Sequence, residues 1–321
     1  MSVLYLVSPG CVAYRSHGRI IVQKDGKKIA ESPIGQVESV VVGEHAHMTM
    51  PILFRFLENG RQISFVDSFG RLVGTLGQER LSLERMEAQK AALTENGGYW
   101  VRWLLGEKLK AQEAVLRSYA KRKRDMELGD RAGQIKKFRL SLLDFDDIDE
   151  LRGVEGVASR CYFEGFPCIV DQSVWNWQGR NRRPPRDGLN ALLSYGYTLL
   201  ERDIRIAIAG AGLDARIGAL HVTSARRDAL VYDLMEPYRP AVIDRFVLKM
   251  ANLGVFTPDS FELKDGACLL KLNSKKIWFK NYEEYLQSPA QKYQGISPRQ
   301  MIRDQIERFA LLLFEGAPPS T

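Results

Sequence analysis

The spacing of apolar residues changes near residue 84, and this change limits what the 321-residue chain can fold into more than any other feature. Before it, short runs of β-branched and aromatic residues alternate with turn-forming residues, a pattern typical of strands. The runs are Leu4–Val7, Cys11–Tyr14, Arg19–Gln23, Val37–Val42, Ile63–Val66 and Arg71–Thr75. Asp25-Gly26, between two of these runs, predicts a hairpin turn. Pro51–Glu58 predicts one short helix.

After residue 84, apolar residues recur at the spacing of a helix. We predict helices over Tyr99–Lys123, Ala132–Leu143, Ile148–Phe163, Gly188–Ala211, Arg226–Met250 and Pro298–Phe314. The segment Val255–Phe279 is expected to be extended and rich in turns. The sequence therefore predicts an α+β protein: a small β-rich domain over residues 1–83, a hinge over 84–97 and a larger, mainly α-helical domain over 98–321.

Composition excludes several classes of protein. Hydrophobic residues make up 45% of the chain and charged residues 26%, which excludes a mostly disordered chain. The four cysteines form no CxxC pair, which argues against a zinc ribbon and a disulfide scaffold. No signal peptide is recognised, and the apolar runs are far shorter than the roughly 20 residues needed to cross a bilayer. We expect a cytoplasmic protein. Its net charge of +7 is compatible with a polyanionic partner.

Arginines are concentrated in one loop that follows two tryptophans, Trp175 and Trp177. The two prolines in this loop prevent a helix. Guanidinium groups bind phosphate oxygens, whereas the tryptophans could stack on a base or pack in the core. We expect the loop to bind the phosphates of DNA rather than to serve as a surface linker, with two arginines further along the chain extending the same surface. The predicted DNA-binding residues are Arg180, Arg182, Arg183, Arg186, Arg226 and Arg227.

Two carboxylates and a histidine lie close together later in the sequence. Asp233 and Glu236 are three residues apart, so they share one face of the predicted helix that follows His221. Pro237 is expected to bend this helix just after Glu236. The alternative is a solvated surface on which Glu236 pairs with Arg239.

A third carboxylate, Glu155, lies between Gly153 and Gly156 in an apolar helical context. Small residues there would allow close helix packing, and a buried carboxylate must be paired, protonated or bound to a metal. An imidazole together with two or three carboxylates suits Mg²⁺ or Mn²⁺ better than Zn²⁺.

Three segments carry a resemblance to a known family. They are LRGVEGVASRCYFEGF (151–166), NRRPPRDGLNALLSYGYTLLERDI (181–204) and GALHVTSARRDALVYDLMEPYRPAVID (218–244). With the order of β before α, they resemble CRISPR-associated protein one, the integrase and endonuclease of the adaptation module, over essentially the whole chain. The resemblance implies that Glu155, His221 and Glu236 are catalytic and bind Mg²⁺ or Mn²⁺. Asp233 is a further candidate for the last ligand.

The resemblance also implies a function and partners. Such a protein would be a metal-dependent DNA endonuclease and integrase that inserts short foreign DNA, the spacers, into a CRISPR array by phosphodiester transesterification. Its partners would be double-stranded DNA (spacer precursor and CRISPR repeat), a second copy in a homodimer with the β domain at the contact, and a small ferredoxin-like adaptation protein. Two alternatives remain: a metal-dependent nuclease acting on branched or repair DNA, and a non-catalytic DNA-binding assembly subunit.

Overall fold

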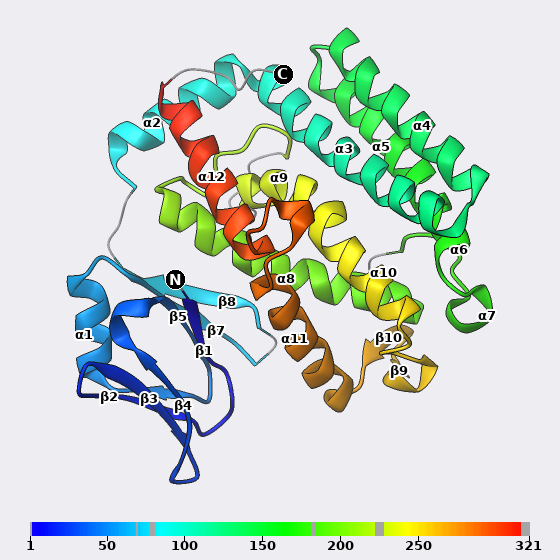
Figure 1. Cartoon of the computed structure of the whole chain (residues 1–321). Helices are drawn as coiled ribbons and strands as arrows, with labels where there is room; N and C mark the ends of the chain where they lie inside the picture. Colours follow the sequence, from blue (N-terminus) through cyan, green and yellow to red (C-terminus); the bar gives the residue numbers. More distant parts are fainter. Residues whose placement is uncertain (1, 69, 78–80, 182–183, 222–227, 316–321) are drawn as a thin grey trace. The chain divides into compact units, whose positions relative to one another are not determined.

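The computed structural model describes residues 2–68, 70–77, 81–181, 184–221 and 228–315. Strands come first in the chain and helices dominate after them (Figure 1). The predicted α+β class is therefore confirmed. The chain divides into two compact units, of which the first comprises Met1–Ser82 with Ile208–Leu213 and the second Leu83–Ala207 with Asp214–Thr321.

The first unit contains, within its described residues, two four-stranded sheets and one α-helix before residue 82. One sheet has the order β1 (Ser2–Leu6), β5 (Val37–Gly43), β7 (Gln62–Val66) and β8 (Leu72–Leu76). In this sheet β5 is parallel to both of its neighbours, and β8 is antiparallel to β7. The other sheet has the order β4 (Lys27–Pro33), β3 (Arg19–Lys24), β2 (Val12–Ser16) and β6 (His47–Met48).

The core of this unit follows the predicted periodicities. Helix α1 (Met50–Glu58) buries Ile52 and Phe56, which lie four residues apart and therefore on one face. The predicted hairpin is present between β3 and β4, where Asp25 and Gly26 have φ values of 51° and 74°. Two consecutive positive φ angles are the geometry of a type I′ turn, which Asp-Gly adopts at low cost.

The second unit is mainly helical. Its helices, with the end of α8 falling in the first unit, are α2 (Leu83–Glu95), α3 (Gly97–Lys123), α4 (Met126–Ser141), α5 (Ile148–Glu164), α6 (Phe166–Ile169), α7 (Gln172–Trp175), α8 (Gly188–Ala211), α9 (Ala229–Tyr238), α10 (Arg245–Asn252), α11 (Leu272–Gln287) and α12 (Pro298–Glu315). Helices α3, α4 and α5 lie side by side (Figure 1), and α9 packs against α3. Helix α3 is thus in contact with both helices that carry predicted site carboxylates.

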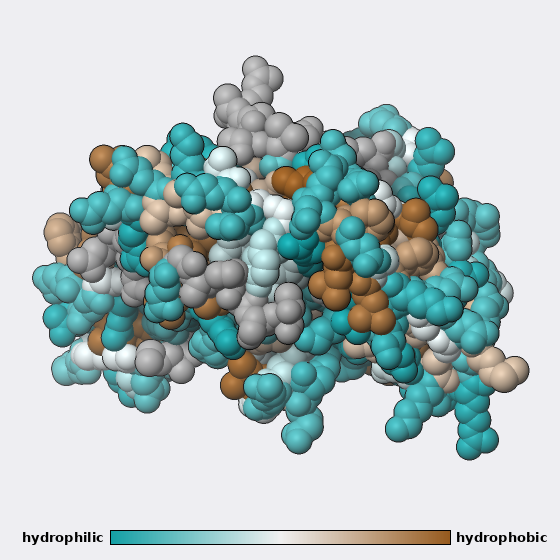
Figure 2. Space-filling model, turned by 90° about the horizontal axis from the view of Figure 1, so that it is seen from above, coloured by the Kyte–Doolittle hydropathy of each residue, from teal (hydrophilic) through white to brown (hydrophobic). Residues whose placement is uncertain are grey.

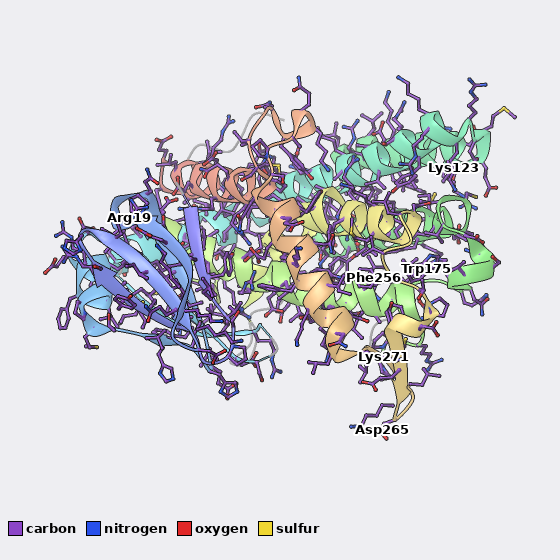
Figure 3. All side chains as sticks on the ribbon, turned by 60° about the horizontal axis from the view of Figure 1, so that its bottom comes forward. Arg19, Lys123, Trp175, Phe256, Asp265 and Lys271 are labelled. Atoms are coloured by element: carbon purple, nitrogen blue, oxygen red, sulfur yellow. The ribbon has the colours of Figure 1, made fainter. Side chains whose placement is uncertain are left out.

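Two predicted segments differ from the structure. The predicted hinge at 84–97 is largely folded as α2, because Leu83–Glu95 is rich in strong helix formers. The segment Val255–Phe279 is extended only in the hairpin of β9 (Phe261–Lys264) and β10 (Ala267–Leu270), whose tip carries Asp265 (Figure 3). Helix α11 then begins at Leu272 and buries Trp278 and Tyr282.

The chain after Pro237 continues as a π-helix rather than a simple bend. Helix α9 passes into a π-helical segment, Arg239–Asp244, and then into α10. Pro237 and Pro240 both lack a backbone N–H, so the regular i→i−4 pattern is interrupted at two places. A π-helical stretch inside an otherwise α-helical run is often found at functional sites. Of the predicted helix Arg226–Met250, the first two residues lie outside the described part of the chain.

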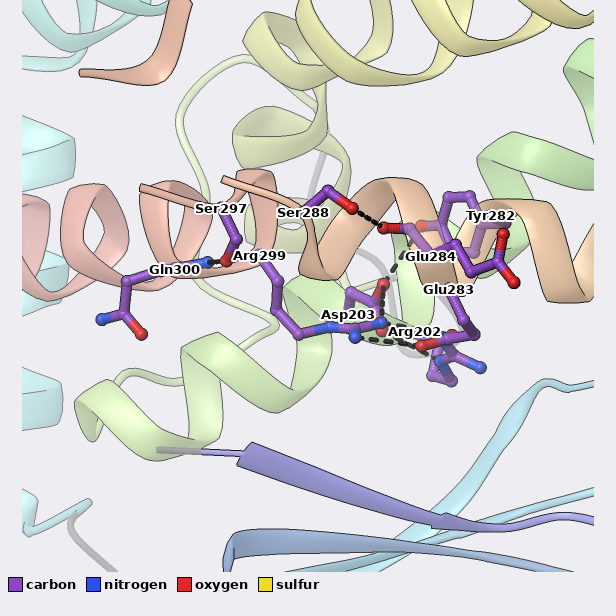
Figure 4. Close-up of polar contacts among 9 residues, drawn as sticks. All are labelled: Arg202, Asp203, Tyr282, Glu283, Glu284, Ser288, Ser297, Arg299 and Gln300. Carbon is purple, nitrogen blue, oxygen red and sulfur yellow. Dashed lines mark hydrogen bonds and ion pairs between the residues drawn. The ribbon is translucent and has the colours of Figure 1, made fainter. Parts of the chain in front are cut away.

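A buried ionic cluster connects three helices of the second unit (Figure 4). Arg202 and Asp203 lie on α8, Glu283 on α11 and Arg299 on α12. Arg202 donates to Asp203 at 2.8 Å, Arg299 pairs with Glu283 at 3.0 Å, and the hydroxyl of Tyr282 donates to Asp203 at 3.1 Å. Two guanidinium groups and two carboxylates balance each other, which is the condition under which charges are stable in a protein interior.

No helix among the described residues is long and apolar enough to span a bilayer. The face of the described chain that Figure 2 shows is mostly hydrophilic, with small apolar patches between the polar residues.

Candidate active site

Glu155 and Glu236 both contact one lysine, Lys108. Glu155 lies on α5, Glu236 on α9 and Lys108 on α3. The Nζ atom of Lys108 donates to Oε1 of Glu155 and lies 2.5 Å from Oε2 of Glu236. Lys108 is only 6% exposed. Two carboxylates that are distant in the sequence therefore meet at one cationic atom in the interior of the helical unit.

Glu236 is buried and ionised. It is 4% exposed, and its Oε1 pairs with Nη1 of Arg239 at 2.8 Å. Burial opposes the charged form, but the positive charges of Arg239 and Lys108 outweigh burial and lower the pKa of Glu236 to about 2. The expected pairing of Glu236 with Arg239 is present, but it lies in the interior rather than on a solvated surface.

Glu155 lies at a more open position, with 26% of its side chain exposed. Its Oε1 accepts a second hydrogen bond, at 2.7 Å, from the hydroxyl of Ser159 one helical turn later. The expectation that Gly153 and Gly156 allow close helix packing is wrong, since a Cβ on either would meet no atom within 4 Å outside its own stretch of helix. The two glycines instead leave the helix surface beside Glu155 bare.

His221 is held in place by Asp233. Oδ1 of Asp233 lies 2.7 Å from Nδ1 of His221 and accepts the backbone N–H of the same residue at 2.9 Å. Oδ2 accepts the N–H groups of Ala219 and Leu220 at 2.7 and 3.0 Å. Asp233 is 1% exposed. The contact with the carboxylate directs Nδ1 of the imidazole toward Asp233, so Nε2 is the ring nitrogen on the side away from this carboxylate.

The close approach of Asp233 to the loop depends on a glycine. A Cβ on Gly218 would lie 2.6 Å from Oδ2 of Asp233 and 2.8 Å from the backbone of Ala229. No side chain fits at these distances without moving the carboxylate or the start of α9. Gly218 is therefore part of the local structure that holds His221.

The fit of a divalent metal to this site is partial. Within the described residues, no group of three or more His, Cys, Asp or Glu side chains is arranged to hold a metal ion. Glu155 and Glu236 nevertheless meet at a cation, and carboxylate oxygens with one imidazole suit Mg²⁺ or Mn²⁺. Asp233, the further candidate ligand, already accepts four hydrogen bonds from the His221 loop. The donor chemistry thus fits at Glu155 and Glu236, and His221 offers Nε2.

The predicted DNA-binding arginines are placed in different ways. Arg182, Arg183, Arg226 and Arg227 lie outside the described residues. Arg186 is exposed. Arg180 is half-buried, with its guanidinium donating to Oδ1 of Asn190 at 2.6 Å and lying over the ring of Tyr197. Trp175 and Trp177 are 6% and 4% exposed, so they pack in the core.

Asp244, at the end of the π-helical segment, forms a second buried acidic position. Its two oxygens accept hydrogen bonds from the hydroxyls of Tyr162, at 3.0 Å, and Tyr197, at 2.6 Å. Burial raises the pKa of Asp244 to about 6, against the lowering effect of the two tyrosine hydroxyls.

Sequence reasoning missed Lys108. It lies on the buried face of α3, beside Leu104, Leu105 and Leu109, all at most 1% exposed. A lysine within such an apolar stripe is unusual unless it is paired. A lysine at this position therefore indicates a buried anionic partner, although the sequence pattern does not identify that partner.

Comparison with known proteins gives consistent results over most of the chain. Residues 4–284 match the family model described as CRISPR associated protein Cas1. A protein named CRISPR-associated endonuclease Cas1 1 from Thermus thermophilus is 32% identical over 284 residues, which cover 88% of this chain and 86% of that protein. A protein of the same name from Methanospirillum hungatei is 31% identical over 89% of this chain and 86% of its own length.

Solved structures share the fold. A CAS1 protein from Thermotoga maritima has a TM-score of 0.76 at 23% identity, with both chains covered completely. A casposase bound to its integration product also has a TM-score of 0.76, at 22% identity, over 99% of this chain and 92% of that one.

Proposed function

Because the chain belongs to the CRISPR associated protein Cas1 family, we propose that it is a divalent-metal-dependent DNA endonuclease and integrase acting in the cytoplasm. Its reaction is the insertion of spacers into a CRISPR array by phosphodiester transesterification. One observation carries the proposal: Glu155 and Glu236, from two helices distant in the sequence, meet at one cationic position. The names of the curated relatives support the endonuclease assignment, and the casposase with its integration product supports integration.

Glu155, Glu236 and Nε2 of His221 would hold the metal, with Mg²⁺ or Mn²⁺ as the ion. When bound, such an ion polarises the phosphoryl group and lowers the pKa of the attacking hydroxyl, either a DNA 3′-end or water. This chemistry needs no serine or cysteine nucleophile.

The other residues of the site position these groups. Asp233 orients the imidazole of His221 through Nδ1 and anchors the loop that carries it. Arg239 pairs with Glu236 and helps to keep it ionised at neutral pH. The bare helix surface at Gly153 and Gly156 leaves room beside Glu155 for a DNA strand. Preorganised groups of this kind reduce the entropy lost when a reacting end is brought into line.

We assign three partners to this activity: double-stranded DNA as spacer precursor and repeat, a second copy of the chain in a homodimer, and a small ferredoxin-like adaptation protein. The likeness to a partial Cas6-RT-Cas1–Cas2 complex, with a TM-score of 0.77 at 23% identity, supports a Cas-protein partner. Exposed Arg186 and the four arginines outside the described residues are the proposed phosphate contacts.

The test is an integration assay with a matched pair of variants. Purified protein is combined with the small partner, a labelled oligonucleotide duplex and a supercoiled plasmid carrying repeats, in Mn²⁺ or Mg²⁺. Glu155→Gln is compared with Glu150→Gln, which removes one charge from an exposed position on the same helix. We expect joining by the wild type and by Glu150→Gln, none by Glu155→Gln, and unchanged DNA affinity for all three.

Other outcomes contradict the proposal in distinct ways. Cleavage without joining would favour a nuclease acting on branched or repair DNA. DNA binding without either reaction would favour an assembly subunit. Full joining by Glu155→Gln would show that the catalytic site lies elsewhere.

A further inference from the structure

Lys108 occupies the place between the two carboxylates to which the proposed function assigns a metal. Its ammonium group reaches Glu155 on one side and Glu236 on the other, and it is 6% exposed. A lysine ammonium is a compact point charge on a flexible stem, so it can neutralise carboxylates as a small cation does.

The charges around Glu236 are balanced without a metal. Formally, the two carboxylates of Glu155 and Glu236 face two cations, Lys108 and Arg239, so their charges cancel. Removing one partner from a buried ion pair leaves an uncompensated charge, which is strongly unfavourable. Lys108 therefore holds the two carboxylates close together before any metal arrives and offsets the repulsion between them.

Both oxygens of Glu236 are already engaged. Oε1 pairs with Arg239 at 2.8 Å and Oε2 with Lys108 at 2.5 Å. A divalent ion coordinates carboxylate oxygen at about 2.0–2.1 Å when it is Mg²⁺. An ion bound to both Glu155 and Glu236 would occupy the space of the ammonium group and repel it.

From this geometry we propose that Lys108 is a built-in cation that holds Glu155 and Glu236 together in the metal-free protein and that a divalent metal displaces when it binds. The inference rests on the proposed function, because it takes Glu155 and Glu236 as metal ligands. It adds that the chain itself supplies a cation, the ammonium group of Lys108, that competes with the metal for the two carboxylates. Metal loading and movement of Lys108 are then one linked equilibrium.

The first test measures metal binding without DNA and without catalysis. Mn²⁺ is titrated into metal-free wild type, Lys108→Met and Lys110→Met, and free Mn²⁺ is followed by electron paramagnetic resonance. Lys110 lies on the same helix, is 64% exposed and pairs with Glu107, so its replacement removes the same charge from the surface. Removing a competitor should tighten Mn²⁺ binding by Lys108→Met about ten-fold. Lys110→Met should bind as the wild type does.

An equal or lower Mn²⁺ affinity of Lys108→Met overturns the inference, because a lysine that supports the ligands would strengthen metal binding. A second measurement uses the wild type and so does not depend on the folding of the variant. The rate at which an amine reagent labels Lys108 is measured by mass spectrometry with and without Mg²⁺. We expect faster labelling with Mg²⁺, and an unchanged rate overturns the inference.

Glu155→Gln in the same titration separates the two proposals. In one outcome the wild type binds Mn²⁺, Glu155→Gln loses this binding and Lys108→Met does not tighten it. This outcome refutes the displacement of Lys108 but leaves the metal site of the proposed function standing. Failure of the wild type and of every variant to bind Mn²⁺ refutes the metal site of the proposed function, and displacement with it. Binding by Lys108→Met but not by the wild type is the strongest support for displacement.

Discussion

Replacing Asp233 by asparagine tests whether one carboxylate holds His221 in its position. The two oxygens of Asp233 accept four hydrogen bonds, three from consecutive backbone N–H groups and one from the imidazole. Asparagine keeps one oxygen and presents an NH₂ group in place of the other. Two of the four donors then face another donor, in a place where the side chain is 1% exposed.

The expected size of the effect follows from these contacts. A hydrogen bond to a charged group contributes about 1.5 kcal/mol at the low end, so two lost bonds cost about 3 kcal/mol. For a helical unit of this size, 1 kcal/mol corresponds to about 2–4 °C, so the melting temperature should fall by about 6–12 °C. The loss is expected to be largest around the backbone of Ala219, Leu220 and His221, whose N–H groups Asp233 accepts.

The assay combines thermal unfolding, followed by circular dichroism at pH 7.5, with hydrogen exchange at single residues. Asp130→Asn serves as the control, because Asp130 is exposed on α4 and its replacement changes the charge equally. The amides of Ala219 and His221 should exchange faster in Asp233→Asn than in the control. A melting temperature equal to that of Asp130→Asn, with these amides unchanged, would refute the reasoning.

Two further predictions concern buried charges elsewhere in the helical unit. The pKa of Asp244 is raised to about 6 from the usual 3.8, so between these values the folded chain binds more protons than the unfolded chain and stability falls as pH rises. Asp244→Asn should therefore raise the melting temperature relative to wild type more at pH 7 than at pH 4, and an equal difference at both pH values would contradict this. Glu283→Gln removes one of the negative charges that neutralise Arg202 and Arg299 in the buried cluster. The free energy of unfolding should therefore fall by about 3–5 kcal/mol. The control is Glu284→Gln, on the exposed side of the same helix. It should change the free energy of unfolding, measured in urea, by less than about 0.5 kcal/mol.

Local signals in the sequence predicted much of the fold. The Asp25-Gly26 hairpin followed from turn chemistry, and the helical stripe of α3 followed from its spacing. Helix α11 was missed because its buried positions, Trp278, Tyr282 and Leu286, lie mostly beyond the segment that was interpreted as extended. The segment predicted as a hinge, 84–97, is largely helical as α2, where helix-forming residues outweigh the flanking glycines.

The candidate site could be predicted only in part. Glu155, His221 and Glu236 came from the resemblance, since spacing alone left Glu236 as a surface residue. The bridging role of Lys108 depends on three helices meeting, and no local pattern contains that information. The inward orientation of Arg180 could not be predicted from a local pattern either, because its acceptor Asn190 and the ring of Tyr197 belong to the following helix.

The π-helical segment Arg239–Asp244 sets the rotational phase of the chain that follows it. Each residue added to or removed from a helix turns everything downstream by about 100°. Helix α10 buries all its residues except Arg245, Lys249 and Asn252, so losing a single residue upstream would turn part of this buried surface toward solvent even if every side chain of α10 were unchanged. Here the number of residues matters more than their identity, and a one-residue deletion should be far more damaging than most substitutions.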